Sequence, residues 1–454
     1  TILCVAAELL SRADGSALNF GLQQDIAGTI NKFASEEQKQ ATLPKLCSGE
    51  WDSSMILTEP DAGSDLQAAS LRAVLGEDGV WRLSGVKRFI TNGCGTIGLV
   101  LARSEENKGA RGLSFFLYRR DDKMIIRRLE HKLGIHGSPT CELQFNGAPA
   151  ELVGERQRGL TKYTMWLMNN ARLGIAAQAV GIAEAAYREA DRYAAKRIQF
   201  DAPVRTFPAV FEMLTEMKVS VEAGRALLYE TARFVDLKEA LEDFSDAHPE
   251  EKGGVVEDKK KYAKLAGFFT PMVKAYTTEM ANKVAYDAIQ IHGGTGYMKE
   301  FNAERHYRDA RITNIYEGTT QLQVVAAIGP VTSGIAQSIL DEYAQAGYPH
   351  AADLEAKVRD ARKLFDETLA YVKSYKGEGS QHFAAYHARR LVEMATDLII
   401  SYLLLWDAAH SERKLKVASI FIAKVPSRIA ACHSFITGDS AAVLLRDYAD
   451  VIGE

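Results

Sequence analysis

The 454 residues are 47% hydrophobic and 25% charged, which is ordinary for a soluble globular protein of two or three domains. The formal net charge of -4 gives no basic surplus for a nucleic-acid backbone, and no apolar run approaches the roughly 20 residues of a membrane span. The cysteines have neither metal-ligand nor disulfide-framework spacing, so free thiols in a reducing compartment and no metal site are expected. They are Cys4, Cys47, Cys94, Cys141 and Cys432.

The first part of the chain is predicted to be helical. Apolar residues recur at helical spacing between Ser16 and Ala34, and Ser35 followed by Glu37 has the pattern of an N-cap with an acidic first turn. The chain does not begin with Met, which leaves open whether a leading segment precedes it.

A domain of short β-strands is predicted from about Trp51 to near Gly159, because apolar and polar residues alternate there between turn residues. Two stretches in it are candidates for ligand contacts. Thr58 and Ser64 stand in the sequence LTEPDAGSD, whose small residues and hydroxyls suit a cofactor as well as a simple turn. The second stretch, Phe89 to Thr91, combines an aromatic ring with a hydroxyl donor, although an aromatic residue in a strand is more often part of the core.

The segment HKLGIHGSPTCELQF, residues 131–145, contains two histidines and a cysteine. Their spacing is not that of a zinc site. His136 stands beside Gly137 and Pro139, so it is expected in a turn.

Long helices are predicted after the β-domain and indicate a helix bundle. They cover residues 160–195, 208–234 and 258–291. The polar stretch from Asp236 to Lys261 is expected to be an exposed loop between two of them. After Pro330 the chain is again helical and slightly acidic, and the apolar run from Leu391 to Trp406 is expected to be a buried helix.

Two arginines of the bundle are candidates for binding phosphate or carboxylate groups. Arg172 interrupts a helix of small residues, and it can bind such a group bidentately, although a solvated arginine is commoner. Arg197 and Phe200 stand in the sequence AAKRIQFDAP at the end of that helix, where a surface arginine with a core phenylalanine is the simpler interpretation.

Glu317 is the main candidate for a catalytic base. It begins the sequence EGTT between two amphipathic runs, so it is expected in a turn or at a helix start. Partial burial under a ligand would raise its pKa toward neutrality, whereas a helix N-terminus without catalytic function would also accept the charge. The upstream sequence QIHGGTGY, residues 290–297, has glycines that allow a close approach to a ligand, and a short charged helix is expected over 299–307.

Three motifs in order resemble the flavin-dependent acyl-CoA dehydrogenases, and the resemblance covers about residues 17–329: LTEPDAGSD, QIHGGTGY and RDARITNIYEGTTQLQ. The sequence GIHGSPTCEL resembles longer members with an added C-terminal domain, such as 3-methylthiopropanoyl-CoA dehydrogenase. The resemblance implies a mostly α fold with a central antiparallel β-domain. Its parts would be a remnant of an N-terminal α-domain (1–50), a β-barrel domain (51–158), a four-helix bundle (159–330) and an extra C-terminal helical domain (331–454). Earlier N-terminal helices would be missing or on another polypeptide.

The resemblance also implies the site. Glu317 would remove the α proton of an acyl-CoA thioester while the β hydrogen leaves as hydride to FAD. The implied FAD contacts are Leu57, Thr58, Phe89, Thr91, Arg197, Phe200, Gln290, Gly293, Gly294, Thr319 and Gln321. The implied substrate contacts are Ser64, Arg172, Tyr316 and Gly318. Those at 197, 200, 290, 293 and 294 would reach the flavin of a neighbouring subunit.

The sequence departs from the family pattern at four positions. Phe89 stands where the family usually has Trp, which keeps the stacking face and loses an indole donor. Asn169 replaces an aspartate that often pairs with Arg172. Asp201 replaces a glycine and Pro208 a glutamine, so one flavin contact is expected to be lost or supplied elsewhere.

The implied partners are an acyl-CoA substrate, an electron-transferring flavoprotein as acceptor, and further copies of the chain in a dimer or tetramer. Such an enzyme of fatty acid β-oxidation would be cytoplasmic in a bacterium and in the mitochondrial matrix of a eukaryote. Two alternatives remain at this point: an acyl-CoA oxidase, and a noncatalytic relative that binds nucleic acid, which the acidic C-terminal part disfavours. The acyl chain is expected to be medium, long or sulfur-bearing.

Overall fold

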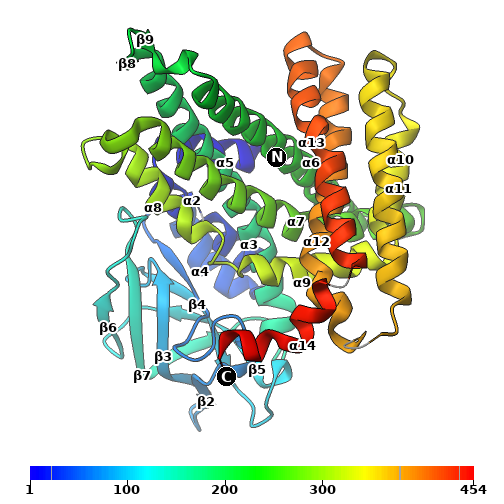
Figure 1. Ribbon diagram of the computed structural model, residues 1–454. Helices are drawn as coiled ribbons and strands as arrows, with labels where there is room; N and C mark the ends of the chain where they lie inside the picture. Colours follow the sequence, from blue (N-terminus) through cyan, green and yellow to red (C-terminus); the bar gives the residue numbers. More distant parts are fainter. Residues whose placement is uncertain (22, 378–379, 439, 454) are drawn as a thin grey trace. The chain divides into compact units, whose positions relative to one another are not determined.

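A computed structural model describes residues 1–21, 23–377, 380–438 and 440–453 (Figure 1). The chain divides into two compact units. One is Leu9–Gly181, and the other combines Thr1–Glu8 with Ile182–Glu454. Helix α5, Met165–Lys196, begins in the first unit and ends in the second.

The N-terminal part is helical, as predicted, but more broken than expected. The helices are α1 (Ile2–Ala13), α2 (Leu18–Gly21), α3 (Gln23–Phe33) and α4 (Glu36–Cys47). A 3-10 turn starts at Gly15, because the Asp14 carboxylate accepts a hydrogen bond of 2.7 Å from the Ser16 N–H. The predicted cap at Ser35 is confirmed: Ser35 and Gln38 form a reciprocal capping box at the start of α4.

The β-domain is a closed barrel. Its strands are β1 (Ser53–Ile56), β2 (Arg72–Leu75), β3 (Trp81–Thr91), β4 (Ile97–Arg103), β5 (Leu113–Arg119), β6 (Met124–Leu129) and β7 (Thr140–Leu152). The ring runs β4-β2-β3-β7-β5 and closes by pairing of β5 with β4, while β6 pairs with β7 and β1 with β4. Most strand pairs are antiparallel, as predicted. Strand β4 is parallel to β1 and β2, because β3 runs in the opposite direction between them in the chain.

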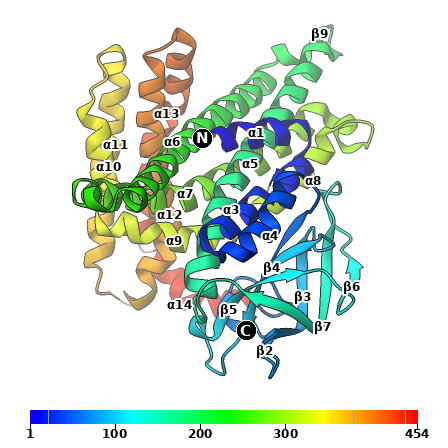
Figure 2. The ribbon, with the colours of Figure 1, turned by 180° about the vertical axis from the view of Figure 1, so that it is seen from behind.

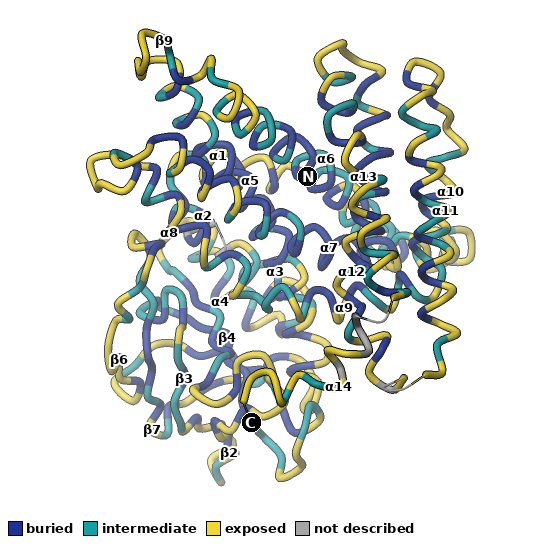
Figure 3. The backbone as a smooth tube through the Cα atoms, in the orientation of Figure 1, coloured by how far each residue is buried: buried dark blue, intermediate teal, exposed yellow. Residues whose placement is uncertain are grey.

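Strand β4 separates two apolar cores. Leu99 and Leu101 pack with Phe115 under α3 and the start of α5, while Val100 and Ala102 face the barrel interior. Figure 2 shows α3 and α4 beside this part of the barrel, and Figure 3 shows buried backbone along β4. Successive side chains of a strand point to opposite faces, so a strand covered on both sides is apolar throughout. The prediction of half-buried strands therefore fails for β4, whose first six residues are all buried.

Two helices of the bundle, α6 and α7, are longer than the sequence predicted. After α5 come a small hairpin of β8 (Ile198–Gln199) and β9 (Ala202–Pro203), then α6 (Pro208–Ala247), α7 (Lys252–His292), α8 (Ala303–Thr313) and α9 (Thr320–Ser333). The exposed loop predicted over 236–261 is wrong, because most of it continues α6 and begins α7. Its charges form solvated helix faces, as in the pairs Lys238–Glu242 and Lys260–Glu257. The short charged helix lies at Ala303–Thr313, later than predicted.

The C-terminal part continues as helices α10 (Ile335–Gln345), α11 (Ala352–Ser374), α12 (Ser380–Ala408), α13 (Glu412–Thr437) and α14 (Ser440–Ile452). Helices α11, α12 and α13 pack side by side (Figure 1). The buried run predicted over 391–406 lies in α12, although Trp406 at its end is exposed. Within the described ranges, no single helix has the length and apolar composition to cross a membrane, and only α9 and α10, bent by 68°, meet that test as a pair.

A buried carboxylate joins α6 to α13. Glu222 of α6 accepts hydrogen bonds from Lys414 Nζ at 2.6 Å and from Arg413 Nη1 at 3.2 Å. Burial opposes ionisation of Glu222, but the hydrogen bond and charge of Lys414 outweigh it and lower the pKa to about 2. The contact therefore fixes the C-terminal helices on the bundle through charges that stay ionised at neutral pH.

His387 in α12 makes the C-terminal part sensitive to acid. The side chain is 0% exposed, and neither ring nitrogen has a hydrogen-bond partner. Burial, with the nearby Arg390, lowers its pKa from 6.5 to about 4. Because the unfolded chain binds the proton more readily, the free energy of unfolding is largest above pH 6.5 and falls between pH 6.5 and 4, by on the order of 3 kcal/mol.

We therefore expect His387→Phe to flatten the pH dependence of thermal unfolding between pH 6.5 and 4, measured by circular dichroism. The exposed His410, changed to Phe, serves as the control and should leave the slope unchanged. An equal slope in the parent and His387→Phe would contradict this role.

Candidate active site

Glu317 lies in a strained turn between α8 and α9. Its φ of 53° is in the left-handed region, and that of Gly318 is 90°. The turn is closed by a 3.1 Å hydrogen bond from the Thr320 N–H to the Asn314 carbonyl, and Thr319 caps α9 by accepting from the Leu322 N–H. Non-glycine residues in this conformation persist only where the surroundings enforce it, and they are frequent at functional sites. The expectation of a turn before a helix start is confirmed.

Two buried side chains donate hydrogen bonds to the backbone of this turn. Lys274 of α7 is 0% exposed, and its Nζ donates a 2.7 Å hydrogen bond to the Gly318 carbonyl. Gln323 of α9 is also buried, and its Nε2 donates to the carbonyls of Glu317 at 3.1 Å and Gly318 at 2.9 Å. With both carbonyls engaged by α7 and α9, the backbone of the turn has one defined orientation.

The sequence did not identify Lys274 or Gln323 as site residues. It named Gln321 instead, whose side chain is exposed on α9. Among the predicted contacts around the turn, Tyr316, Gly318 and Thr319 are half-buried. In the sequence, Lys274 is simply a lysine among the apolar residues of a long helix. A lysine at such a position is more often on the surface.

The barrel brings together four predicted contacts in one place. The Arg88 N–H donates to the Thr58 carbonyl at 2.9 Å, which joins the stretch at 57–58 to the one at 89–91. Lys87 is buried, and its Nζ donates to the Leu57 carbonyl at 2.7 Å and to Glu59 Oε1 at 2.9 Å. Burial, only partly offset by the charge of Glu59, lowers the pKa of Lys87 to about 8.

Phe89 lies at an irregularity in β3 that turns its ring outward. The pairing of β3 with β7 shifts register between Lys87 and Ile90, and Phe89 has a φ of 60°. Bulges of this kind re-aim a side chain. The ring is 54% exposed, so it is not part of the barrel core, and it lies beside the half-buried Thr91. The Arg88 guanidinium lies over the ring, 4.7 Å from its centroid, so only the exposed part of the ring is available to a ligand. These residues therefore fit a planar aromatic group such as a flavin ring.

Ser64 and Arg172 are the other two predicted contacts in this unit, and they are far from each other in the sequence. Ser64 is exposed in the turn that follows Thr58. Arg172 of α5 is buried, and its Nη1 donates to Asn169 Oδ1 at 3.0 Å. The asparagine that replaces the family's aspartate thus still accepts a hydrogen bond from the charged arginine, but through a neutral amide oxygen instead of a carboxylate.

A second cluster of predicted contacts lies in the bundle. Phe200 and Asp201 form the turn of the β8–β9 hairpin, with φ values of 48° and 61°, and Phe200 is 91% exposed. Such turns favour glycine at the second position, which explains the glycine of the family pattern. Three of the seven non-glycine residues with positive φ in the described chain are therefore predicted site residues: Phe89, Phe200 and Glu317.

The glycine-rich segment after α7 is attached to the end of α5, just before this hairpin. Thr295 Oγ1 donates to the Tyr193 hydroxyl at 3.1 Å, and the ring of His292 stacks on that of Tyr193 at 4.4 Å. Four predicted contacts of this region are exposed: Arg197, Gln290, Gly293 and Gly294. A Cβ added at either glycine would meet no heavy atom within 4 Å, so packing inside the chain does not require glycine there.

Comparison with known proteins gives the family. Acyl-CoA dehydrogenase models match in succession: the N-terminal domain at residues 1–50, the middle domain at 54–148, the C-terminal domain at 158–250 and 254–327, and a further C-terminal model at 332–441. The short-chain-specific acyl-CoA dehydrogenase of Megasphaera elsdenii is 34% identical over 332 residues, 72% of this chain and 80% of that protein. The chain belongs to the acyl-CoA dehydrogenase family.

Two further comparisons concern the longer members of the acyl-CoA dehydrogenase family. The 3-methylmercaptopropionyl-CoA dehydrogenase of Ruegeria pomeroyi is 37% identical over 354 residues, 71% of this chain, and the match spans only 57% of that protein. An acyl-CoA dehydrogenase of Bacillus anthracis, solved in complex with FAD, matches 99% of this chain and 81% of its own with a TM-score of 0.82 at 24% identity, which supports the fold.

Family membership confirms several predictions from the sequence. These are the mostly helical fold with a β-barrel domain, the extra C-terminal helical domain, the acyl-CoA dehydrogenase class of oxidoreductase and FAD as cofactor. Family membership by itself assigns no role to an individual residue.

Proposed function

We propose that the chain dehydrogenates an acyl-CoA thioester between Cα and Cβ, with Glu317 as the base that takes the α proton. The observation that supports this role is the strained φ of Glu317 in a turn whose carbonyls are held by Lys274 and Gln323. A base must be positioned within hydrogen-bond reach of one particular proton, and a backbone fixed on both sides provides such positioning. Comparing turnover of Glu317→Gln with that of the parent tests the role.

The negative charge that develops on the thioester oxygen needs hydrogen-bond donors fixed in advance. The carbonyls of residues 317 and 318 point to α7 and α9, where Lys274 and Gln323 bind them. In our proposal the Glu317 N–H donates to the thioester oxygen, so the same residue positions the substrate and removes its proton. Tyr316 and Gly318 flank the acyl group, while Ser64 and Arg172 contact the rest of the ester.

In the proposed site, residues of the barrel contact FAD. Leu57, Thr58 and Thr91 supply polar groups of the barrel, and Phe89 supplies the aromatic face at the bulge. When bound, FAD accepts the hydride that leaves Cβ, which completes the two-electron oxidation of the substrate. An electron-transferring flavoprotein is the proposed oxidant of the reduced enzyme. Comparing dye reduction with peroxide formation separates this dehydrogenase from an oxidase.

The acyl group is proposed to be medium, long or sulfur-bearing. The similarity to the Ruegeria pomeroyi protein, which is a 3-methylmercaptopropionyl-CoA dehydrogenase, supports a sulfur-bearing chain. Anaerobic bleaching of the flavin by a panel of acyl-CoAs tests this, from short to very long chains and including a thioether. A strong preference for a short dicarboxylic ester would contradict it.

We further propose that the hairpin and glycine-rich cluster contacts the FAD of a neighbouring subunit in a homo-oligomer. A phenylalanine that is 91% exposed at a hairpin tip, with Tyr297 at 78%, is what an isolated chain leaves uncovered when a partner normally covers it. If the cluster binds FAD in this way, cofactor binding and assembly stabilise each other.

Reversing the charge at Arg197 is therefore expected to weaken both. Arg197→Glu places a carboxylate where an anionic cofactor is proposed to bind, so the purified protein should be poor in FAD and partly dissociated. Size-exclusion chromatography with absorbance at the flavin band measures both effects. The matched charge reversal Lys108→Glu, at an exposed loop position, should change neither. A parent protein that is a stable FAD-bound monomer would contradict the shared site.

A further inference from the structure

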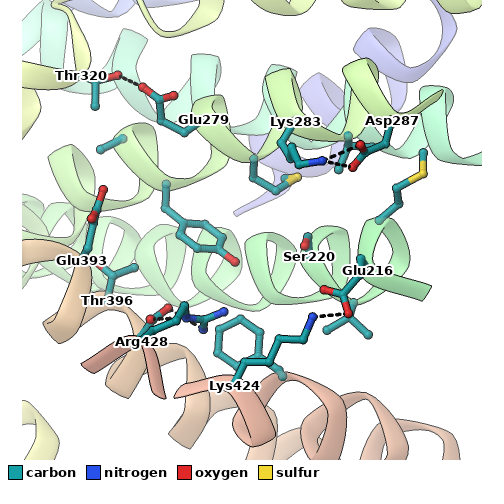
Figure 4. Close-up of a pocket in the computed structure, with 18 of the residues that line it drawn as sticks. Glu216, Ser220, Glu279, Lys283, Asp287, Thr320, Glu393, Thr396, Lys424 and Arg428 are labelled. Carbon is teal, nitrogen blue, oxygen red and sulfur yellow. Dashed lines mark hydrogen bonds and ion pairs between the residues drawn. The ribbon is translucent and has the colours of Figure 1, made fainter. Parts of the chain in front are cut away.

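A cavity lies in the unit that contains the bundle and the C-terminal helices. It has a volume of about 570 Å³ and is lined by α6, α7 and the start of α9 on one side and by α12 and α13 on the other (Figure 4). Thr320, beside the predicted FAD contacts Thr319 and Gln321, is the point where its lining comes nearest to them in the sequence. None of the predicted FAD or substrate contacts is among the described residues that line it. Its volume is within the range of sites for small organic molecules. It is formed where the C-terminal helices meet the bundle.

The walls of the cavity are apolar and adaptable. Four of the ten methionines of the chain line it, on α6 and α7: Met213, Met217, Met272 and Met280. Phe421 and valines of α7, α9 and α12 complete the apolar part. Methionine side chains are flexible and polarisable, so such walls accept an aliphatic chain without requiring one shape.

The described basic side chains that line the cavity are all engaged by carboxylates, so none of them is available to bind an anionic ligand. In the described part of the lining every basic side chain is ion-paired, as Figure 4 shows for three of the four pairs. The pairs are Lys283 with Asp287, Arg389 with Glu393, Lys424 with Glu216, and Arg428 with Asp397. Six carboxyl groups face four cations, so the lining has a surplus of negative charge.

Among these carboxylates, Glu279 is the best placed to bind a cationic group of a ligand. It is half-buried and accepts a 2.6 Å hydrogen bond from the neutral Thr320 hydroxyl, as Figure 4 shows. Arg389, which pairs with Glu393, also interacts with the charge of Glu279 and offsets part of it. The other lining carboxylate outside the four ion pairs, Glu212, is exposed, so water competes for it more strongly. Tyr276, one helical turn before Glu279, adds an aromatic ring and a phenol to the same wall. A carboxylate, an aromatic ring and thioethers together favour an ammonium group.

We propose that this cavity is a ligand site for an aliphatic molecule with one protonated amine. The ammonium group binds Glu279 beside Tyr276, and the chain lies among the methionines. An anionic amphiphile such as a free fatty acid is excluded by the carboxylate surplus. The proposal concerns binding alone, so its test does not depend on the role of Glu317.

Isothermal titration of the FAD-bound protein at neutral pH with octylamine, octanoate and octan-1-ol tests the site. Octylamine is expected to bind once per chain, and more tightly than the other two by about tenfold, the effect of one charge-assisted contact. Glu279→Gln keeps an acceptor for Thr320 and should weaken octylamine binding by about tenfold. The control Glu212→Gln should change it little, and Met213→Trp should abolish it by filling the cavity.

Three results would overturn the proposal. These are no binding of octylamine to folded protein, octanoate binding as tightly as octylamine, and equal affinity of the parent and Glu279→Gln. Circular dichroism of each variant verifies that the fold is kept. If Glu212→Gln weakened binding as much as Glu279→Gln, the amine would not be held at Glu279, which also contradicts the assignment.

Discussion

Replacing Glu317 with glutamine is expected to lower turnover with an artificial acceptor by about 10²–10⁴-fold, the range for loss of a general base. The amide has nearly the shape of the carboxylate, so the φ of 53° and the hydrogen bonds from Lys274 and Gln323 to the backbone remain. The yellow colour and binding of acyl-CoA should therefore be unchanged. Steady-state dye reduction and flavin content measure the two effects separately.

The control for this substitution is Glu257→Gln, an exposed glutamate on α7 that pairs with Lys260. It should keep full activity. A Glu317→Gln protein that retains most of the parental turnover would remove Glu317 from the proposed role, while the family assignment would stand.

Replacing Lys274 with methionine is expected to have the second-largest effect. Methionine has a similar length, but it leaves the Gly318 carbonyl with Gln323 as its remaining donor. A small displacement of a catalytic group can cost about 100-fold in rate, so we expect kcat to fall by about 10–100-fold. The melting temperature is measured beside kcat, because the substitution also removes a buried hydrogen bond.

This combination separates positioning from a merely structural role. If Lys274 only stabilised the fold, the substitution would lower the melting temperature and leave kcat of the folded fraction unchanged. Lys274→Gln, which retains a donor, should recover part of kcat. Parental kcat in Lys274→Met at full FAD content would contradict positioning of the turn by this lysine.

The two buried lysines perform comparable tasks in the two units. Lys87 holds the Leu57 carbonyl in the barrel, and Lys274 holds the Gly318 carbonyl in the bundle. Each therefore fixes the backbone of a predicted site stretch without belonging to it. A buried ammonium group is expensive to desolvate, and such groups are retained where they define one conformation.

Local features were predictable from the sequence because their partners are close in the chain. The capping box at Ser35 is set by Gln38, three residues on, and the turn at Glu317 follows from the glycine and the capping threonine beside it. The motifs at 57–65, 290–297 and 308–323 gave the family for the same reason. Each is a continuous stretch whose residue types are fixed by chemistry at one place.

Features that depend on distant partners were not predictable. The polar stretch at 236–261 was misjudged for a different reason: its composition is that of a loop, but its charges pair three and four residues apart on solvated faces of α6 and α7. Lys274 meets Gly318 across 44 residues of sequence, and Lys87 meets Leu57 across 30, so nothing near either lysine distinguishes it from a surface lysine. The outward turn of Phe89 comes from a register shift in the pairing of β3 with β7, which periodicity along β3 does not reveal.

The most direct test of the central claim is a single anaerobic turnover, followed by bleaching of the flavin band. The FAD-bound parent and Glu317→Gln are mixed with the best acyl-CoA of the panel, either protiated or dideuterated at Cα. If Glu317 takes the α proton, the parent bleaches more slowly with the deuterated ester, and Glu317→Gln binds the ester but hardly bleaches with either. Bleaching of Glu317→Gln at the parental rate, or a parental rate indifferent to deuterium at Cα, would contradict the account.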